Sequence, residues 1–309
     1  MASIVNVVLP IFALILAGFI CRRTNRIGEH ASGELNRFVV WLALPALLFK
    51  VTATATWDEI WQPGFVATLC ISTAIIFVIT VWLRTTKEIK LVDACIDGLS
   101  ASYANTGFLG IPLCLLVFGE KGLLPAVIAT LIVACVLFAI GIILVEVSLQ
   151  EERHPTKAFI KVSKALISNP LLVAPIIGGC WSATGATLNS AVFQFISLLG
   201  MAATPCALVS LGAFLAIRQS GHSEGAVGLI VAKLILQPAI TGVLAFYVFE
   251  LPVIWAKSAL LLSALPTGTG PFMLASFYQR EAALVSKVIL FTTLLSVLSV
   301  SICLYSLGL

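Results

Sequence analysis

Long apolar runs separated by short polar stretches make up almost all of this chain of 309 residues. Most runs are about 20 residues long, the length of an α-helix that crosses the roughly 30 Å hydrocarbon core of a bilayer. They do not show the alternation typical of an outer-membrane barrel. The pattern therefore predicts an all-α polytopic membrane protein with ten transmembrane helices. The expected spans cover residues 2–21, 36–56, 64–83, 91–118, 122–149, 168–185, 191–217, 225–249, 254–278 and 283–306.

The longest polar connection follows the fifth span and divides the chain into two halves. We expect a first five-helix repeat over residues 1–149, a cytoplasmic linker over 150–167, and a second repeat over 168–309. An odd number of spans per repeat inverts the second copy, which gives the 5+5 inverted repeat common among secondary transporters. Prolines and Thr-Gly pairs recur in the two halves at a nearly constant offset. The matching positions are Pro10 and Pro175, Pro45 and Pro205, and Thr106-Gly107 and Thr267-Gly268.

Two expected spans are interrupted near their middle by glycine, proline and small hydroxylated residues. The fourth contains Asn105-Thr106-Gly107-Phe108-Leu109-Gly110-Ile111-Pro112, and the ninth contains Pro266-Thr267-Gly268-Thr269-Gly270-Pro271. An unsatisfied backbone group in a bilayer costs several kcal/mol, so non-helical backbone persists there only where it lines a cavity or is buried in protein. At about 1.5 Å per residue, both breaks reach the middle third of the membrane. We expect the two broken helices to cross there.

A half-helix that starts at such a break presents N–H groups and a partial positive charge, which suits a carboxylate. An alternative is that the breaks are proline kinks used for packing, but two breaks at corresponding positions favour a binding site. The predicted substrate-binding residues are Asn105, Thr106, Gly107, Pro112, Pro266, Thr267, Gly268, Thr269, Gly270 and Pro271, with Ser102 and Tyr103 as cavity-lining candidates.

Three ionisable residues inside spans are candidates for charge coupling, because such residues are costly in a membrane. Asp93 and Asp97 lie one turn apart at the start of the fourth span, and Lys233 lies in the eighth. Similar depths predict an Asp97–Lys233 ion pair. The pair is either structural or changes partners when a proton or an anionic substrate arrives.

The distribution of basic residues predicts the orientation. Fourteen of the 18 lysines and arginines lie in or beside loops that follow odd-numbered spans, against Lys50, Lys121 and Lys257 after even-numbered ones. The excess places the odd loops in the cytoplasm and both termini outside it. Because the basic residues cluster in loops between spans, no nucleic-acid partner is expected. Eight cysteines without a CxxC pair and three isolated histidines predict no metal site, and no cofactor is expected beyond a coupling proton or sodium ion.

Several motifs resemble the auxin efflux carrier family over essentially the whole chain. They are Leu9-Pro10, Ala43-Leu44-Pro45-Ala46-Leu47-Leu48-Phe49, the break at Asn105, Asn169-Pro170, Ala232-Lys233-Leu234 and the break at Thr267. The second break is most similar to bacterial malonate and dicarboxylate carriers. Plant members have a proline in each broken span and an asparagine beside it; Asn105 matches the first asparagine, but the second break has Thr267 and Thr269 instead. The long central loop of the plant carriers is missing.

The resemblance implies a fold similar to sodium–proton antiporters, with spans 1, 2, 6 and 7 as a scaffold and spans 3–5 and 8–10 as a transport core. It also implies a homodimer in a bacterial inner membrane, moving organic anions by an elevator-like motion. The function we expect is secondary transport of malonate or a related dicarboxylate. Alternatives are an auxin-like monocarboxylate or a bile-acid-like anion as substrate, or a channel or sensor. Neither an ATP-binding motif nor the motifs of a membrane enzyme occur.

Overall fold

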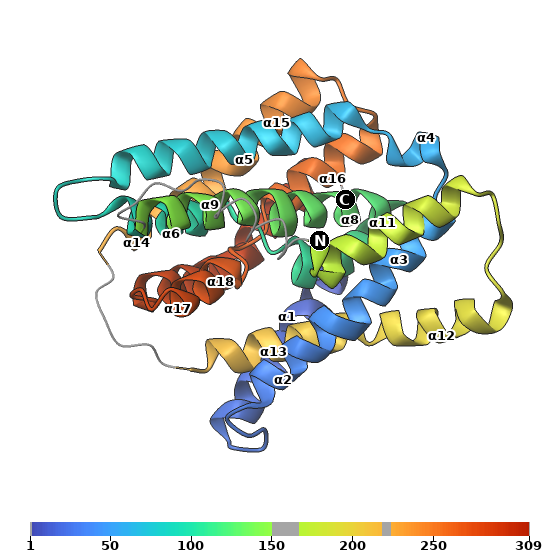
Figure 1. Ribbon diagram of the computed structural model, residues 1–309, viewed down its shortest axis with the longest axis horizontal. Helices are drawn as coiled ribbons and strands as arrows, with labels where there is room; N and C mark the ends of the chain where they lie inside the picture. Colours follow the sequence, from blue (N-terminus) through green and yellow to red (C-terminus); the bar gives the residue numbers. More distant parts are fainter. Residues whose placement is uncertain (1, 150–166, 218–223, 309) are drawn as a thin grey trace. The chain divides into compact units, whose positions relative to one another are not determined.

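A computed structural model describes residues 2–149, 167–217 and 224–308, and every regular element within them is a helix (Figure 1). The prediction of an all-α protein is confirmed for these residues. The expected linker lies outside them except for Ile167. The chain forms two compact units, and each draws segments from both halves of the sequence. Unit 1 comprises Met1–Pro63, Gly107–Ile128 and Ile167–Arg218, and unit 2 comprises Gly64–Thr106, Ala129–Leu166 and Gln219–Leu309.

Unit 1 is built on helices that approach closely through glycines. Gly18 of α1 lies against Val209 of α13, and Gly212 of α13 lies against the backbone of Ile15. Small residues at such contacts let two membrane helices pack backbone to backbone. The helices of this unit are α1 (Ala2–Arg23), α2 (Ala31–Phe38), η1 (Val39–Ala43), α3 (Leu44–Thr54), α4 (Trp57–Ile60), α7 (Ile111–Phe118), η3 (Gly119–Gly122), most of α8 (Leu123–Leu131), α11 (Pro170–Ala183), α12 (Ser190–Met201) and α13 (Ala203–Leu215).

Unit 2 contains two helices, α6 and α16, that stop after 12 and 11 residues. Helix α6 packs beside α9, with Gly141 of α9 against Leu99, and α17 packs beside α18 (Figure 1). The helices of this unit are α5 (Pro63–Arg84), α6 (Leu91–Ser102), η4 (Ile132–Leu137), α9 (Phe138–Leu149), α14 (Ala226–Val231), η5 (Ala232–Leu236), α15 (Gln237–Val243), η6 (Leu244–Val248), α16 (Val253–Ser263), α17 (Gly270–Phe277) and α18 (Ala283–Ser306).

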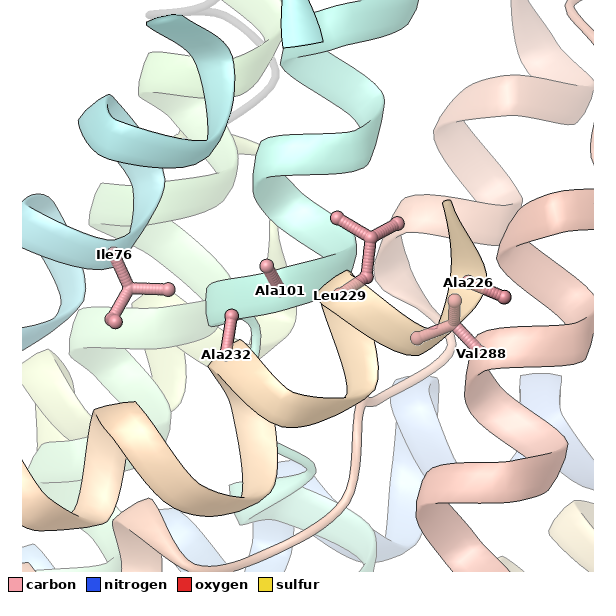
Figure 2. Close-up of a cluster of buried hydrophobic side chains, with 6 residues drawn as sticks. All are labelled: Ile76, Ala101, Ala226, Leu229, Ala232 and Val288. Atoms are coloured by element: carbon pink, nitrogen blue, oxygen red, sulfur yellow. The ribbon is translucent and has the colours of Figure 1, made fainter. Parts of the chain in front are cut away.

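A buried apolar cluster fixes the end of α6 inside unit 2. Ala101, one residue before α6 ends, is fully buried among side chains from α5, α14, η5 and α18 (Figure 2). Small residues at Ala101, Ala226 and Ala232 bring these helices close together. The remaining members of the cluster are Ile76, Leu229 and Val288.

Seven helical stretches among the described residues are long and apolar enough to cross a membrane. The sequence predicts ten spans, and the physical reasons for the difference are visible. Helices α6 and α16 are too short to count because each stops at a break, α11 is only 14 residues long, and a tight 3-10 turn joins the fourth and fifth expected spans into one run. The seven are Ile4–Arg23, Ala31–Thr54, Trp57–Arg84, Thr106–Leu149, Ser190–Leu215, Ala226–Val248 and Ala283–Ser306.

Candidate functional site

The first break is shorter than the sequence predicts. Helix α6 ends at Ser102, and helical backbone resumes at Thr106 in the π-helical turn η2 (Thr106–Gly110). Only residues 103–105 are non-helical, so the expected interruption over Asn105–Pro112 is corrected. Pro112 is the second residue of α7, which continues η2 without interruption, so its missing N–H leaves a gap in the hydrogen bonds of a helical run that already began at Thr106. Gly107 and Pro112 belong to unit 1.

The second break is displaced in the same way. Helix α16 ends at Ser263, residues 264–269 are non-helical, and α17 begins at Gly270 with Pro271 in its first turn. The expected interruption over Pro266–Pro271 is therefore corrected at both ends. At this second break the proline, Pro271, starts the second half-helix instead of ending the first.

The two breaks meet, as the sequence predicts. The Asn105 amide donates to the carbonyl oxygen of Pro266 at 2.9 Å, and the Gly268 amide donates to that of Tyr103, also at 2.9 Å. Ala104 and Thr267 thereby face each other as an isolated antiparallel bridge. Backbone groups that lack helical partners at one break are thus satisfied by the other.

Thr267 extends this pairing with its side chain. Its hydroxyl donates to the carbonyl oxygen of Ser100 near the end of α6 at 2.7 Å, and its backbone amide donates to the hydroxyl of Thr292 in α18 at 3.1 Å. Thr267 is fully buried, so both hydrogen bonds are sheltered from water. We interpret Thr267 as part of the framework that joins the breaks.

Two buried side chains of the η5–α15 segment contact the last residues of the broken helices. The ammonium of Lys233 donates to the carbonyl oxygen of Ser263 at 2.8 Å, and the amide nitrogen of Gln237 donates to that of Ser102 at 3.1 Å. Gln237 is absent from the candidates predicted from the sequence. The available signal was its position one helical turn after Lys233, on the same face of an otherwise apolar span.

Tyr103 lies against the start of α17. A Cβ atom added to Gly268 would stand 3.0 Å from the Tyr103 ring, and one added to Gly270 would stand 2.6 Å from it. The first turn of α17 has no side-chain cap, because the Thr269 side chain forms no capping hydrogen bond. Tyr103 and Thr269 are both partly exposed. This helix N-terminus therefore has two hydroxyl-bearing side chains beside it.

The other predicted polar candidates are more enclosed. Asn105 and Thr106 are buried, with 5% and 3% of their surfaces exposed. Ser102 does not line a cavity with its hydroxyl, because that group is buried and donates to the carbonyl oxygen of Gly98 in its own helix. Of the two cavity-lining candidates, Tyr103 is partly exposed and Ser102 is buried.

The predicted Asp97–Lys233 ion pair is wrong. Asp97 instead accepts a hydrogen bond from the guanidinium of Arg84, at the end of α5, at 2.8 Å. Arginine at a helix end reaches Asp97 readily because it is long and its charge is spread over a planar fork. Lys233 forms its hydrogen bond with a neutral carbonyl oxygen.

Asp93 forms a second ion pair, with Arg280 in the connection between α17 and α18. The guanidinium donates to both carboxylate oxygens, and hydrogen bonding to Asp93 raises the pKa of Arg280 above its ordinary value. Both ion pairs border a polar cavity of about 310 Å³ that Glu88, Glu224 and Glu281 also line. Asp93 and Asp97 therefore tie α6 to two neighbouring segments of unit 2.

Several helices are long and apolar enough to cross a bilayer, and two helical segments are broken and pair with each other at their breaks. Together these features are typical of an integral membrane transporter. The chain matches the family of membrane transport proteins over residues 3–304, and it belongs to this family, which includes the auxin efflux carriers. It is a transporter and not an enzyme.

Relatives extend over nearly the whole chain. A Rhizobium meliloti protein named "Putative malonate transporter" is 30% identical, covering 99% of this chain and 96% of its own length. An "Uncharacterized transporter" of Methanothermobacter thermautotrophicus is 26% identical, covering 94% of each chain. "Auxin efflux carrier component 8" of Arabidopsis thaliana is 23% identical, covering 95% of this chain and 94% of its own.

Proposed function

We propose that this protein is a secondary carrier of small organic anions, most specifically of malonate or a related dicarboxylate, and works by alternating access. The observation that carries the proposal is the pairing of two broken helices beside the uncapped start of α17. The name of the Rhizobium meliloti relative supports the choice of malonate.

The start of α17 is where the anion would bind. The helix dipole favours negative charge there, and the hydroxyls of Tyr103 and Thr269 add hydrogen-bond donors. Gly268 and Gly270 leave room for the Tyr103 ring at this point. Neutral donors bind an anion without holding it as tightly as a full ion pair would, which suits a site that must also release it.

The inverted repeat and the division into scaffold and core are part of the same proposal. Unit 1 contains most of the first, second, sixth and seventh expected spans, and unit 2 contains most of the third, eighth, ninth and tenth, so the contact units support that division. We propose that unit 2 moves relative to unit 1 in an elevator-like transition. We further propose a homodimer in the bacterial inner membrane with both termini outside the cytoplasm.

The test is uptake of labelled malonate into proteoliposomes that contain the purified protein. Unlabelled malonate trapped inside should accelerate uptake of the label, because a carrier exchanges solute across the membrane whereas a channel does not. Succinate, acetate and an aromatic monocarboxylate serve as competitors, and runs at two pH values with and without sodium identify the coupling ion. Absence of uptake and exchange for the whole panel would refute the proposal.

The site itself is tested with Asn105→Ala, which shortens a buried side chain at the break. We expect transport to fall at least about tenfold, the effect of losing roughly 1.4 kcal/mol of binding. Asn189→Ala is the matched control, because Asn189 caps α12 in unit 1. Equal transport by both variants would contradict the site assignment.

A further inference from the structure

Lys233 and Gln237 form one buried pair of donors that reaches both broken helices. They lie one turn apart, at the π-helical turn η5 and the first residue of α15, and are 0% and 2% exposed. Lys233 donates to the carbonyl oxygen of Ser263, the last residue of α16, and Gln237 donates to that of Ser102, the last residue of α6.

The two contacts are made where a broken helix needs them. The last carbonyl groups of a helix receive no hydrogen bond from an N–H group of the same helix, and the helix dipole places partial negative charge there. An ammonium at the end of α16 is therefore favourable, and a neutral amide meets the same need less strongly at the end of α6. Ser299 of α18 adds a hydrogen bond of 3.0 Å to the carbonyl oxygen of Ala264, which directly follows α16.

Gln237 has features that simple packing does not explain. Its amide nitrogen also donates to the hydroxyl of Thr73 in α5, at 3.3 Å. Its amide oxygen, however, is buried without a hydrogen-bond partner among the described residues. Such an oxygen costs free energy that an apolar side chain of similar size would avoid. The compensating interaction is the one that the amide nitrogen makes with the end of α6.

We propose that Lys233 and Gln237 are positioning residues that hold the two helix breaks in register with each other. Because both side chains project from one helical segment, a displacement of either break is transmitted to the other through η5–α15. The consequence for transport rests on the proposed function, since the paired breaks form the anion site only if the protein carries anions. The effect on the breaks themselves does not depend on the substrate.

Hydrogen–deuterium exchange of the full-length protein in detergent tests the positioning role without a substrate. Lys233→Met should raise exchange in residues 264–269 roughly tenfold, and Gln237→Leu should do so in residues 103–106, since each variant removes one hydrogen bond to a helix end. Lys257→Met is the matched control. Lys257 also donates to a helix-end carbonyl oxygen, that of Leu307 at 2.8 Å; it belongs to α16, but its hydrogen bond is with the end of α18 and not with a break.

Malonate uptake by the same variants gives the functional readout. Lys233→Met and Gln237→Leu should both lower uptake about tenfold, and Lys257→Met should not. Lys233→Arg and Gln237→His should retain more activity because each can still donate a hydrogen bond. Where a variant does not fold, Lys233→Leu or Gln237→Met, which also lack the donor, replaces it in the exchange experiment. Native exchange at both breaks, or a rise spread evenly over unit 2, would overturn the positioning role. Failure of the wild type to transport any carboxylate would refute the proposed function, while the exchange pattern would still decide this inference.

Discussion

The ring of Tyr103 lies directly against Gly270, the first residue of α17. An ideal Cβ atom on Gly270 would stand only 2.6 Å from Cζ of that ring, closer than side chains approach in folded proteins. Tyr103 belongs to the first break and Gly270 starts the half-helix after the second, so this contact joins the two. A glycine is required here by the close approach and not by its backbone angles, because Gly270 is helical.

Gly270→Ala should therefore disturb the break by pushing Tyr103 away from α17. We expect the free energy of unfolding to fall by about 1–3 kcal/mol, the usual effect of overpacking, and malonate uptake to fall at least about tenfold. Melting temperature in detergent and proteoliposome uptake measure the two effects. Gly228→Ala in α14 is the control, since nothing lies within 4 Å of that position and alanine favours a helix. Unchanged uptake by Gly270→Ala would show that the Tyr103 contact is dispensable.

Thr267→Val should loosen the pairing of the breaks while keeping the shape of the side chain. The Ser100 carbonyl oxygen loses a buried hydrogen bond of 2.7 Å, which should destabilise the protein by about 1–3 kcal/mol. Thermal unfolding measures this effect, and Thr267→Ser should recover most of it. Thr293→Val is a matched control because the buried Thr293 hydroxyl donates only to Ile289 in its own helix. Equal losses in Thr267→Val and Thr293→Val would mean that the hydroxyl of Thr267 adds nothing specific between the helices.

The positions of the breaks could be predicted from sequence because their signal is local. Glycine, proline and threonine inside an apolar run oppose a continuous helix wherever they occur. The limits of each break could not be predicted as well. Proline ends a helix in its interior but is favourable in its first turn, so Pro271 starts a half-helix that the sequence placed within the break. Pro112 lies inside the helical run that begins at Thr106, directly after the π-helical turn η2.

The partners of the buried polar groups could not be predicted from sequence. Depth along a helix suggested Lys233 for Asp97, but depth leaves the direction of each side chain open. Arg84, which the sequence places in a loop, reaches back to Asp97 through its long side chain. Gln237 was missed because an uncharged residue in an apolar span resembles an ordinary polar substitution until its contacts are known.

The contact with Arg84 changes what we expect of Asp97. The Asp97 side chain is 7% exposed and that of Arg84 is 23% exposed, so the pair is mostly enclosed, and Asp97 lies more than one turn before the break that ends α6. Asp97→Asn leaves the guanidinium without its charged partner and should destabilise the protein by about 1–3 kcal/mol. This is less than the loss of a fully buried ion pair costs, because solvent near the partly exposed Arg84 screens its charge.

If the role of Asp97 is structural, the double variant Arg84→Met/Asp97→Asn should recover part of that stability, because no partly buried charge is left unpaired. The folded Asp97→Asn protein should bind malonate with the same affinity as the wild type, and its uptake should depend on pH in the same way. Thermal unfolding and uptake between pH 5 and pH 8 provide the measurements, with the exposed Asp58 changed to Asn as the control. A shift in the pH profile of Asp97→Asn without a loss of stability would instead assign Asp97 to charge coupling. That result would return Asp97 to the candidates for charge coupling.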